Sequence, residues 1–566
     1  RSRIVETLGL VRSRIAGLPL SAIARDQGEA LEVRMVAASA LGQRVGSAEA
    51  REVLARLASG DGPLADAARL SLIDLEAERH ERRRGAGLTV AQLFLHADID
   101  PDLGQAGSGD NGGIATLLVR LGNALIARGA ESVHPIDRVI TVSRGSVEST
   151  LASLDELRAG DAGHAYGRVP LMVEPVQAAS AWPLRVTARR GIRRVLRAAG
   201  PVDVLHLRMA DVGSLAAVDA ARELSIPVVF TVAPDPHAVV ASMDQAGALT
   251  RSNFGSVDER EHFWFRTRLV QRIAANAAHT VLFPRPDLKR DMLSLVSIDI
   301  TAHPERHTIV PEGIDLEVID RAVAEASTAS PSPARAELTA LLEQLPPDRR
   351  GLPLIVSVGR FHRVKGMATI VEAWAASDVR DRANLLLIGG NLDEPSEDEQ
   401  EQLDLIHAVV PAEGRHAAGL LLPGHRANDT VARWVAASRR GIPGLAAANG
   451  IYVCGSLKEE FGIALLEAMA SGLMVVAPNG GGPATYVEQG VTGYLTSTWH
   501  VGKLAEAMTE ALDAASAETT DARAELSRRT VAESFTIQAM AGSLADVYAM
   551  VHDQELAHHA VPVPAP

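Results

Sequence analysis

The sequence has very little cysteine and few aromatic residues. Its 566 residues include one cysteine, Cys454, and Phe, Trp and Tyr together make up 3% of the chain. A single cysteine excludes a disulfide framework or a cysteine-rich zinc site within the chain. The scarcity of aromatic residues leaves Ala, Leu and Val to fill the hydrophobic cores. The near-absence of cysteine fits a reducing compartment, so we expect a cytoplasmic protein.

Long apolar runs and an excess of positive charge are also missing. No apolar stretch reaches the roughly 20 residues that a membrane-spanning helix needs, so no membrane span is expected. Charged residues interrupt residues 1–17, which argues against a secretion signal there. The formal net charge is -14. A surface of that sign repels polyanions, so nucleic acid is not an expected partner.

The first 88 residues carry a helical pattern only. Val33, Val36, Ala37, Ala40 and Leu41 follow the i, i+3, i+4, i+7, i+8 spacing of one buried helix face. The region resembles HEAT-type helical hairpins, and a plain helical cap on the main body is the alternative. Either arrangement offers a surface for a homo-oligomer or for another protein partner.

The rest of the chain alternates strands and helices, which predicts α/β domains with parallel sheets. The strand candidates are 88–98, 138–143, 203–207, 227–232, 279–284, 353–358, 384–389, 418–422, 450–455 and 473–478. We predict two doubly wound, Rossmann-like domains over 89–325 and 345–530, joined by a linker rich in Ser, Pro and Ala at 326–344. A crossover helix over 531–556 and a disordered tail over 557–566 would follow. Ligands bind at the carboxyl ends of such strands, so both domains should face one cleft.

Two segments that follow strands have the composition of anion sites. In "GSGDNGGIAT" (107–116), Gly112 and Gly113 would present backbone N–H groups at the start of a helix, although a flexible glycine turn is the simpler interpretation. In "VSVGRFHRVKG" (356–366), Arg360 and Lys365 follow a strand. Two cations there suit a diphosphate, and a solvated basic loop is the alternative.

A third segment, "KEEFGIALLEAMASG" (458–472), contains two glutamates eight residues apart. The strand before it would bring Glu459 into the cleft, and Glu467 would lie on the helix that follows. The first turn of that helix has free amides that can bind a phosphate or sugar hydroxyls, at Phe461, Gly462 and Ile463. The spacing of two glutamates is by itself common and indicates nothing.

Taken together, these motifs resemble the retaining glycosyltransferases of family 4, which have the GT-B fold. Glu459 to Glu467 with "EAMASGLMVVAPNGGGP" is similar to the E-x7-E region, "VGRFHRVKG" to the diphosphate loop, and "VPEGIDLEVI" (310–319) to the "PNGVD" segment at the interdomain hinge. "GDNGGIATLLVRLGNAL" and "VDVLHLRMADVGSLAA" are similar to segments of the sucrose-phosphate synthase and sucrose synthase branch. The resemblance covers about residues 90–550, in order.

The resemblance implies a nucleotide-sugar donor in the second domain and an acceptor in the first. Arg360 and Lys365 would stabilise the leaving diphosphate, Glu467 would hold the ribose, and Glu459 would contact the donor sugar. Phe461, Gly462 and Ile463 would bind the donor through their amides, together with Gly112 and Gly113. Preorganised cations and amides would supply most of the catalysis. No metal and no cofactor is expected besides the nucleotide sugar as co-substrate.

Several positions depart from the family pattern. Ala233 stands where the family has a histidine after "VFT", with Asp235 and His237 shortly after. Either His237 takes over that catalytic role with Asp235 near the acceptor, or His237 is a structural loop residue. Arg208 replaces a neutral residue of the branch's "HGHYAD". Arg208, Arg144 and Arg285 would form a basic acceptor pocket suited to a phosphorylated sugar, although each could instead be an ordinary surface or ion-paired arginine.

The sequence therefore predicts a retaining hexosyltransferase. It would move a hexosyl unit from a nucleoside diphosphate sugar, similar to UDP-glucose, to a small polar acceptor such as a sugar or a sugar phosphate. One alternative with the same fold is a sugar-nucleotide epimerase or a glycogen-type synthase. Another is a regulatory or scaffold protein with an inactive transferase domain. Ala233 favours that last alternative, while the intact Arg360, Lys365, Glu459 and Glu467 argue against it.

Overall fold

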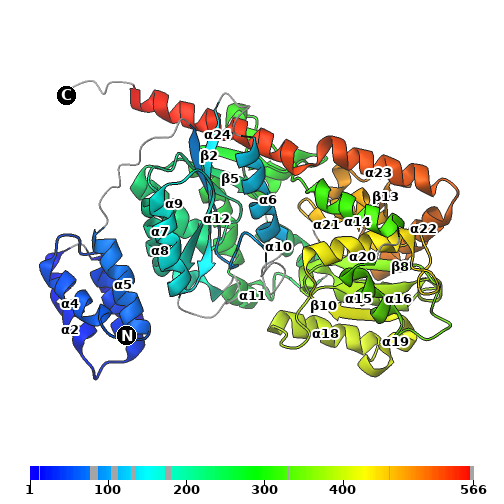
Figure 1. Cartoon of the computed structure of the whole chain (residues 1–566), viewed down its shortest axis with the longest axis horizontal. Coiled ribbons are helices and arrows are strands. Elements are labelled where there is room, and N and C mark those ends of the chain that lie inside the picture. The colour runs from blue at the N-terminus through cyan, green and yellow to red at the C-terminus, as the bar shows by residue number, and fades with distance from the viewer. Residues whose placement is uncertain are drawn as a thin grey trace.

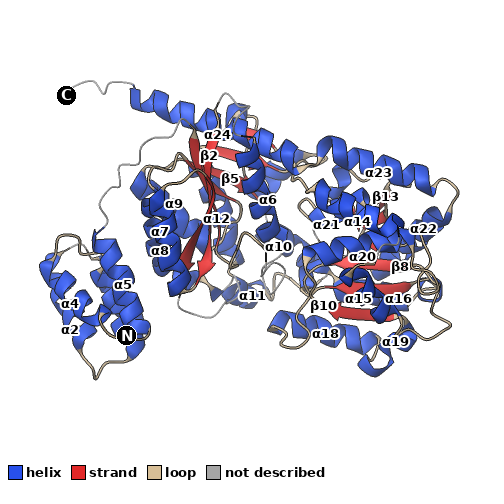
Figure 2. Cartoon of the chain, viewed as in Figure 1, coloured by secondary structure: helices blue, strands red, loops and turns tan. Residues whose placement is uncertain are grey.

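The computed structural model describes residues 1–11, 13–76, 87–103, 113–128, 134–171, 180–233, 235–245, 247–328, 331–457 and 459–560. Helices alone make up the described part of residues 1–76, and two parallel sheets with helices on both faces make up the rest (Figures 1 and 2). The predicted fold class, a helical region followed by two Rossmann-like domains, is confirmed.

The N-terminal helices pack into a small bundle with its own core. They are α1 (Ser2–Leu10), α2 (Gly17–Arg25), α3 (Leu31–Leu41), α4 (Ala48–Ala58) and α5 (Pro63–Glu76). Leu20, Leu41 and Leu54 are fully buried in that core. The HEAT-like character of these helices stays a prediction. The bundle contacts the next domain through a buried ion pair between Asp74 and Arg194, with 2.7 Å between Oδ2 and Nη2.

The first sheet has seven parallel strands in the order β3-β2-β1-β4-β5-β6-β7. Their bounds are β1 (Leu88–Phe94), β2 (Ile136–Gly145), β3 (Gly163–Pro170), β4 (Val204–Leu207), β5 (Val228–Val232), β6 (His279–Leu282) and β7 (His307–Ile309). The helices of this domain are α6 (Gly113–Ala127), α7 (Val147–Ala159), α8 (Arg185–Ala199), α9 (Val212–Leu224), α10 (Asp235–Gln245), α11 (Phe254–Glu261), α12 (Phe263–Asn276) and α13 (Leu288–Asp291).

The second sheet has six parallel strands in the order β10-β9-β8-β11-β12-β13. Their bounds are β8 (Leu354–Val358), β9 (Asn384–Ile388), β10 (Leu420–Gly424), β11 (Ile451–Val453), β12 (Met474–Pro478) and β13 (Gly493–Thr496). The helices are α14 (Leu316–Thr328), α15 (Pro333–Leu342), α16 (Met367–Ala375), α17 (Val379–Arg382), α18 (Glu397–Val409), α19 (Arg415–Ala418), α20 (Asn428–Arg440), α21 (Ile463–Ala470), α22 (Val501–Ser516) and α23 (Thr520–Ser534).

Strands that are buried on both faces appear in the sequence as apolar runs, and the sequence pattern located every strand of this kind. It missed β3 and β13 at the edges of the two sheets and the short β7. β3 contains two glycines and ends in a proline, residues that disfavour the interior of a sheet, and four of its eight residues lie partly exposed at its start. An edge position tolerates this composition, which explains why no strand pattern was visible.

The interval 326–344, expected to be a linker, contains α15. Ala334, Leu338 and Leu342 are buried in the core of the second domain, and the Trp434 Nε1–H donates to the Ala334 carbonyl at 2.7 Å. The small, apolar residues of this interval therefore form a buried helix face instead of a flexible connection. α14 also belongs to this core, through Val318 and other apolar residues, so the chain has passed between the domains earlier than residue 325.

The chain passes between the two domains twice, and the two passages lie side by side. Ile314, before α14, forms a parallel bridge with Thr536, between α23 and α24 (Ile537–Ala560). The Ile314 N–H donates to Phe535 O at 2.9 Å. A Cβ on Gly313 would lie 2.2 Å from the Thr536 carbonyl oxygen, so only glycine allows this approach. α24 then packs against the first domain (Figure 1), and it continues to Ala560, into the predicted tail; residues 561–566 lie outside the described part.

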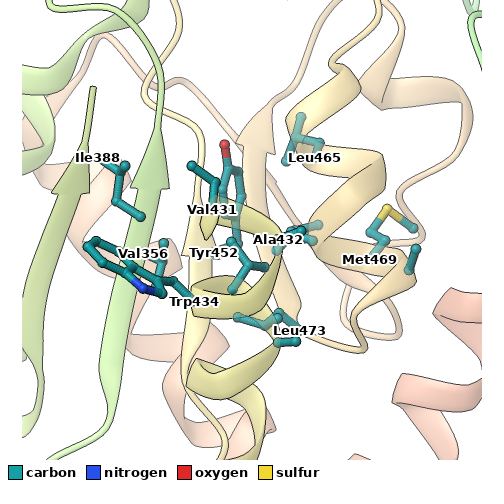
Figure 3. Packing of buried hydrophobic residues seen from close by; sticks show 14 of the residues in the cluster. Val356, Ile388, Val431, Ala432, Trp434, Tyr452, Leu465, Met469 and Leu473 are labelled. Atoms are coloured by element: carbon teal, nitrogen blue, oxygen red, sulfur yellow. The ribbon is translucent and has the colours of Figure 1, made fainter. Parts of the chain in front are cut away.

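The largest core of the second domain lies between its sheet and α20 and α21. Figure 3 shows Val356 and Tyr452 from adjacent strands facing Trp434 and Leu465 from the two helices. Trp434 is fully buried. Such packing fixes where the loops at the carboxyl ends of β8 and β11 begin, because both strands and the start of α21 are held in one rigid cluster.

Candidate functional site

The loop after β8 carries the two predicted diphosphate ligands. Arg360 is exposed, and Lys365 closes a short 3-10 helix, Arg363–Lys365, which begins with the His362 side chain accepting from the Val364 N–H. Gly366 follows at φ +64°, and a Cβ there would lie 2.0 Å from the Gly455 carbonyl oxygen. This glycine therefore lets the loop after β8 lie directly against the loop after β11.

Lys365 and Glu459 form an ion pair at this contact. Lys365 Nζ lies 2.9 Å from Glu459 Oε2, and the Ser456 hydroxyl donates to the same oxygen at 2.9 Å. Burial is the largest single influence on Lys365 and lowers its pKa, but the Glu459 carboxylate and Cys454 together raise the pKa above its usual value. Lys365 is therefore a fixed positive charge, and the structure brings together two of the residues that the sequence predicted as catalytic.

The start of α21 points its free amides toward the first domain. Gly462, at φ +95°, is the residue before the helix, and a Cβ there would lie 2.8 Å from the Tyr486 hydroxyl. Phe461 is 1% exposed, so only its backbone can serve a ligand. Ile463 lies opposite Gly113, the first residue of α6, because a Cβ on Gly113 would lie 3.7 Å from Ile463 Cδ1. Two helix N-termini thus face each other from different domains, an arrangement that favours an anion.

Glu467, the predicted ribose ligand, lies in the second turn of α21. Its carboxylate accepts from the Asn428 side-chain amide, at the start of α20, at 3.5 Å. Burial raises the pKa of Glu467 to about 7, against the opposing effect of the Asn428 hydrogen bond. The Glu467 carboxylate can accept further hydrogen bonds, and the hydroxyls of a ligand's diol would supply them.

Arg208 is the prominent charge on the acceptor side. It directly follows β4 and is 6% exposed, and its Nε and Nη2 atoms are buried without a hydrogen-bond partner in the described part of the chain. Burial lowers the pKa of Arg208. Buried polar groups are nearly always hydrogen-bonded, so a buried guanidinium with unused donors indicates a ligand that supplies the acceptors.

Sequence reasoning missed a dyad beside Arg208. His96, after β1, and Asp211, the residue before α9, are 2.8 Å apart, and the Ser214 N–H donates to the other Asp211 oxygen at 2.7 Å. Both side chains are nearly buried. The His96 hydrogen bond contributes to holding the pKa of Asp211 below its usual range despite burial. The signal was available, because both residues follow strands that are adjacent in the sheet.

The other two predicted acceptor arginines lie at β2 and after β6, and their part in one acceptor pocket with Arg208 stays a prediction. Arg285, after β6, pairs with Glu460 of the second domain and lies 3.8 Å from Asp291. Arg144 closes β2, and its N–H donates to the Ala97 carbonyl at 2.9 Å. The arginine trio is therefore spread from β2 to β6, and Arg285 acts in an ion pair between the domains.

The remaining predicted residues lie around α10 and the glycine turn. Ala233 packs against the core of the second domain, which gives a physical reason for a small side chain at that position. His237 lies on α10 and is partly buried, and its catalytic role stays a prediction. The Asp235 side chain and Gly112 lie outside the described residues, so their roles also stay predictions.

The diphosphate loop also contacts the first domain. Val364 packs against an apolar cluster of α10, α11 and α12 that includes Val239, Val257 and Phe263. Arg363, next to it, pairs with Glu261 at the end of α11 at 2.7 Å. The loop that the resemblance assigns to the donor is thus held partly by the acceptor-side domain.

Another charged residue that the sequence patterns did not assign to the site is Glu312. It follows β7 in the segment where the chain passes between the domains, and it is partly buried. Burial raises the pKa of Glu312 to about 7; Arg208 opposes the shift, Glu459 adds to it, and Lys365 opposes it. Glu312 therefore lies within electrostatic reach of both the donor-side ion pair and the acceptor-side arginine.

Within the described ranges, no three His, Cys, Asp or Glu side chains converge to hold a metal ion. Among the helices that the structure describes, none is both long and apolar enough to cross a membrane. The expectations of no metal and no cofactor stay predictions.

Residues 352–514 match the model of the family "Glycosyl transferases group 1". The matched part includes β8, the loop that follows it, Glu459 and α21. The chain resembles the sucrose synthase and sucrose-phosphate synthase branch of glycosyltransferases with the GT-B fold.

The similarity to curated proteins covers part of each chain. A sucrose synthase of Acidithiobacillus caldus is 31% identical over 184 residues, which are 30% of this chain and 22% of that protein. The chain thus spans about a fifth of the length of such relatives.

Solved structures extend the fold likeness to most of the chain. A sucrose-phosphate synthase from Thermosynechococcus elongatus has a TM-score of 0.58 at 19% identity and covers 82% of this chain and 100% of its own. Anabaena HepE in complex with UDP and glucose has a TM-score of 0.51 at 14% identity, covering 82% of this chain and 99% of its own.

Proposed function

We propose that the protein is a retaining glycosyltransferase that moves a hexosyl unit from a nucleoside diphosphate sugar to a small polar acceptor. The observation that carries the proposal is the Lys365–Glu459 pair, which lies where the N-termini of α6 and α21 face each other. Cations and helix amides gathered at one point suit a diphosphate leaving group. The HepE complex with UDP and glucose supports a UDP-sugar as the donor.

Each of the site residues has its own role in such a transfer. Arg360 and Lys365 neutralise the charge that develops on the diphosphate as its bond to the sugar breaks, in the absence of a metal ion. Glu459, held by Lys365 and Ser456, accepts hydrogen bonds from the sugar hydroxyls. Glu467 accepts from the ribose diol. The leaving phosphate takes the proton of the attacking acceptor hydroxyl, so that the new bond forms on the face that the diphosphate leaves.

The test is nucleotide release from a panel of UDP-, GDP- and ADP-sugars, with and without a pool of sugars and sugar phosphates. We expect release that depends on one donor and one acceptor. Glu459→Ala and Arg360→Ala should lower it at least about 100-fold, because each removes a group that acts in the transition state. The matched control is Glu488→Ala, a change at an exposed carboxylate away from the site.

The other outcomes are equally informative. Isomer formation or hydrolysis without an acceptor would favour an epimerase with the same fold. No binding and no turnover of any nucleotide sugar would contradict the proposal and leave a scaffold role for the chain.

A further inference from the structure

The end of β6 in the first domain packs against the start of α21 in the second domain through two adjacent contacts. The Phe283 ring, directly after β6, stacks on the Phe461 ring, with centroids 6.1 Å apart and planes inclined by 26°. Two residues further on, Arg285 pairs with Glu460. Both rings are buried, and the Arg285 side chain is 5% exposed. This β6–α21 contact therefore joins the domains directly beside Glu459, the predicted ligand of the donor sugar.

The aromatic half of the β6–α21 contact is held from several segments. Phe461 packs against Tyr486 and Phe535, which also pack against each other, with ring centroids 5.7, 5.7 and 5.4 Å apart. Phe535 lies where the chain passes between the domains, and its carbonyl accepts from the Ile314 N–H. Aromatic residues make up only 3% of the chain, so four of them gathered here, Phe283 included, indicate a rigid contact.

The ionic half of the contact acts on the backbone that carries Glu459. Glu460 follows Glu459 directly in the chain, and its carbonyl accepts from the Gly482 N–H at 2.9 Å. The backbone of Glu460 is thus held within the second domain, whereas its side chain contacts Arg285 of the first domain. Because close-packed interiors transmit small displacements, a shift of the Glu460 carboxylate would reorient Glu459 and the first amides of α21.

The two partners of the ion pair differ in what they keep if the β6–α21 contact opens. Arg285 also lies 3.8 Å from Asp291 of α13, so its own domain presents it with a counter-charge. Glu460 is paired with Arg285 across the junction, so opening removes that counter-charge from a largely buried carboxylate. Such a loss is unfavourable unless the carboxylate moves toward water. The arrangement of the start of α21 therefore depends on the first domain.

We propose that Arg285 is a positioning residue of the transfer, which acts through Glu460 and sets the orientation of Glu459 and of the first amides of α21. One arginine of the first domain would then orient the groups that bind the donor. The inference rests on the proposed function, and it gives Arg285 a role other than binding a phosphorylated acceptor.

The first experiment measures kcat and the KM values of donor and acceptor, by nucleotide release with each acceptor that supports turnover. Arg285→Gln should lower kcat about 10- to 30-fold, by the same factor with every acceptor, because misplaced groups lose reactivity. Both KM values should stay within about twofold, since ground-state binding is retained. Arg285→Lys should recover to within about threefold of the wild type, because it keeps the charge but not the planar guanidinium.

The partner residue separates positioning from acceptor binding. Glu460→Gln should lower kcat about as much as Arg285→Gln, and the double variant should be no slower than either, because two residues that act as one unit are not additive. Arg272→Gln, at an exposed arginine of α12, is the control. A raised acceptor KM with kcat retained in Arg285→Gln, and no change in Glu460→Gln, would assign Arg285 to the acceptor and overturn the inference.

A second measurement does not need turnover. Amide hydrogen exchange reports how firmly the start of α21 is held. Arg285→Gln and Glu460→Gln should each speed exchange at Phe461 to Ile463 about tenfold and leave α8 and α20 as in the wild type. Exchange at Phe461 to Ile463 that matches the wild type in both variants contradicts the proposed link.

The outcomes also separate this inference from the proposed function. Turnover of a nucleotide sugar with kcat retained in Arg285→Gln overturns the positioning role and leaves the transferase standing. Faster exchange at the start of α21 in both variants, without turnover of any nucleotide sugar by the wild type, supports the link from Arg285 to α21 and counts against the transferase. Unchanged exchange together with no turnover overturns both.

Discussion

In the domain built on β8 to β13, Lys365 and Glu459 pair with each other at the carboxyl edge of the sheet, whereas in the domain built on β1 to β7 the buried Arg208 has no such partner among the described residues, although His96 and Asp211 pair nearby in the chain. Lys365, Glu459 and Ser456 form one network, and Glu467 has Asn428. Arg208 keeps unused donors, and Arg285 pairs across the junction. The second domain therefore holds Lys365 and Glu459 with its own residues, while Arg208 in the first domain keeps N–H groups that no described residue accepts from.

The largest expected effect would break the donor-side network. Lys365→Met should lower kcat about 10²- to 10³-fold, because it removes a fixed positive charge from the leaving diphosphate and leaves Glu459 without its partner. Nucleotide release with the best donor and acceptor measures it. Lys503→Met is the matched control, since Lys503 is an exposed lysine on α22. Equal losses in the two variants would contradict the assignment.

The next prediction concerns the buried ion pair that joins the N-terminal bundle to the first domain. Asp74→Asn should cost about 3 kcal/mol in the free energy of unfolding, because it leaves the buried Arg194 without its counter-charge. Urea denaturation and hydrogen exchange of α3 and α5 measure it. Glu76→Gln, at an exposed pair with Arg51, should cost less than about 1 kcal/mol. Unchanged exchange in α3 and α5 would show that the pair does not hold the bundle.

The folding stability should depend on pH through Glu467 in the second domain. Burial raises the pKa of Glu467 from 4.5 to about 7, so between these values the folded state binds more protons than the unfolded state. Stability then falls as the pH rises through this window, by at most about 1.4 kcal/mol per pH unit for one group. Glu467→Gln should have a flatter profile of melting temperature from pH 5 to 8, and Glu488→Gln should follow the wild type. Parallel profiles for all three proteins would refute the buried-carboxylate explanation.

The smallest effect concerns the contact between the two halves. Glu261→Gln removes the partner of Arg363 and should raise the donor KM by no more than about threefold, because partly exposed ion pairs contribute less than about 1 kcal/mol. Initial-rate kinetics measure it, with Glu259→Gln on the exposed face of α11 as the control. A tenfold or larger change would mean that this pair, and not the Val364 packing, holds the loop in place.

Local sequence patterns located the charged residues at the strand ends of the second domain better than the contacts made in the first, for a physical reason. Lys365, Glu459 and Glu467 lie within short motifs attached to central apolar strands, so strand ends and local spacing locate them. The acceptor side depends on contacts between distant segments. The pairing of Arg285 with Glu460 and that of His96 with Asp211 each join residues more than 100 positions apart, so short-range spacing does not reveal them, although His96 and Asp211 both follow strands that the sequence pattern located.

The same limit applies to the fold. Buried strands and the helices between them were visible from apolar runs, while β3, β7 and β13 were hidden because they are short or lie at an edge. The Ser and Pro residues at the start of α15 favour a loop, so the composition predicts a linker there. In the structure, Ser332 caps the helix and Pro333 occupies its first position. Both residues are common at a helix start, so composition alone was misleading there.

The packing of Val364 against α10, α11 and α12 has a thermodynamic consequence. If an acceptor shifts that helical cluster and the shift alters how the loop holds a diphosphate, the two ligands are linked. The factor by which the acceptor tightens the donor must then equal the factor by which the donor tightens the acceptor. A linkage of about 1 kcal/mol would amount to roughly fivefold in each direction, and the order in which the substrates arrive would follow from it.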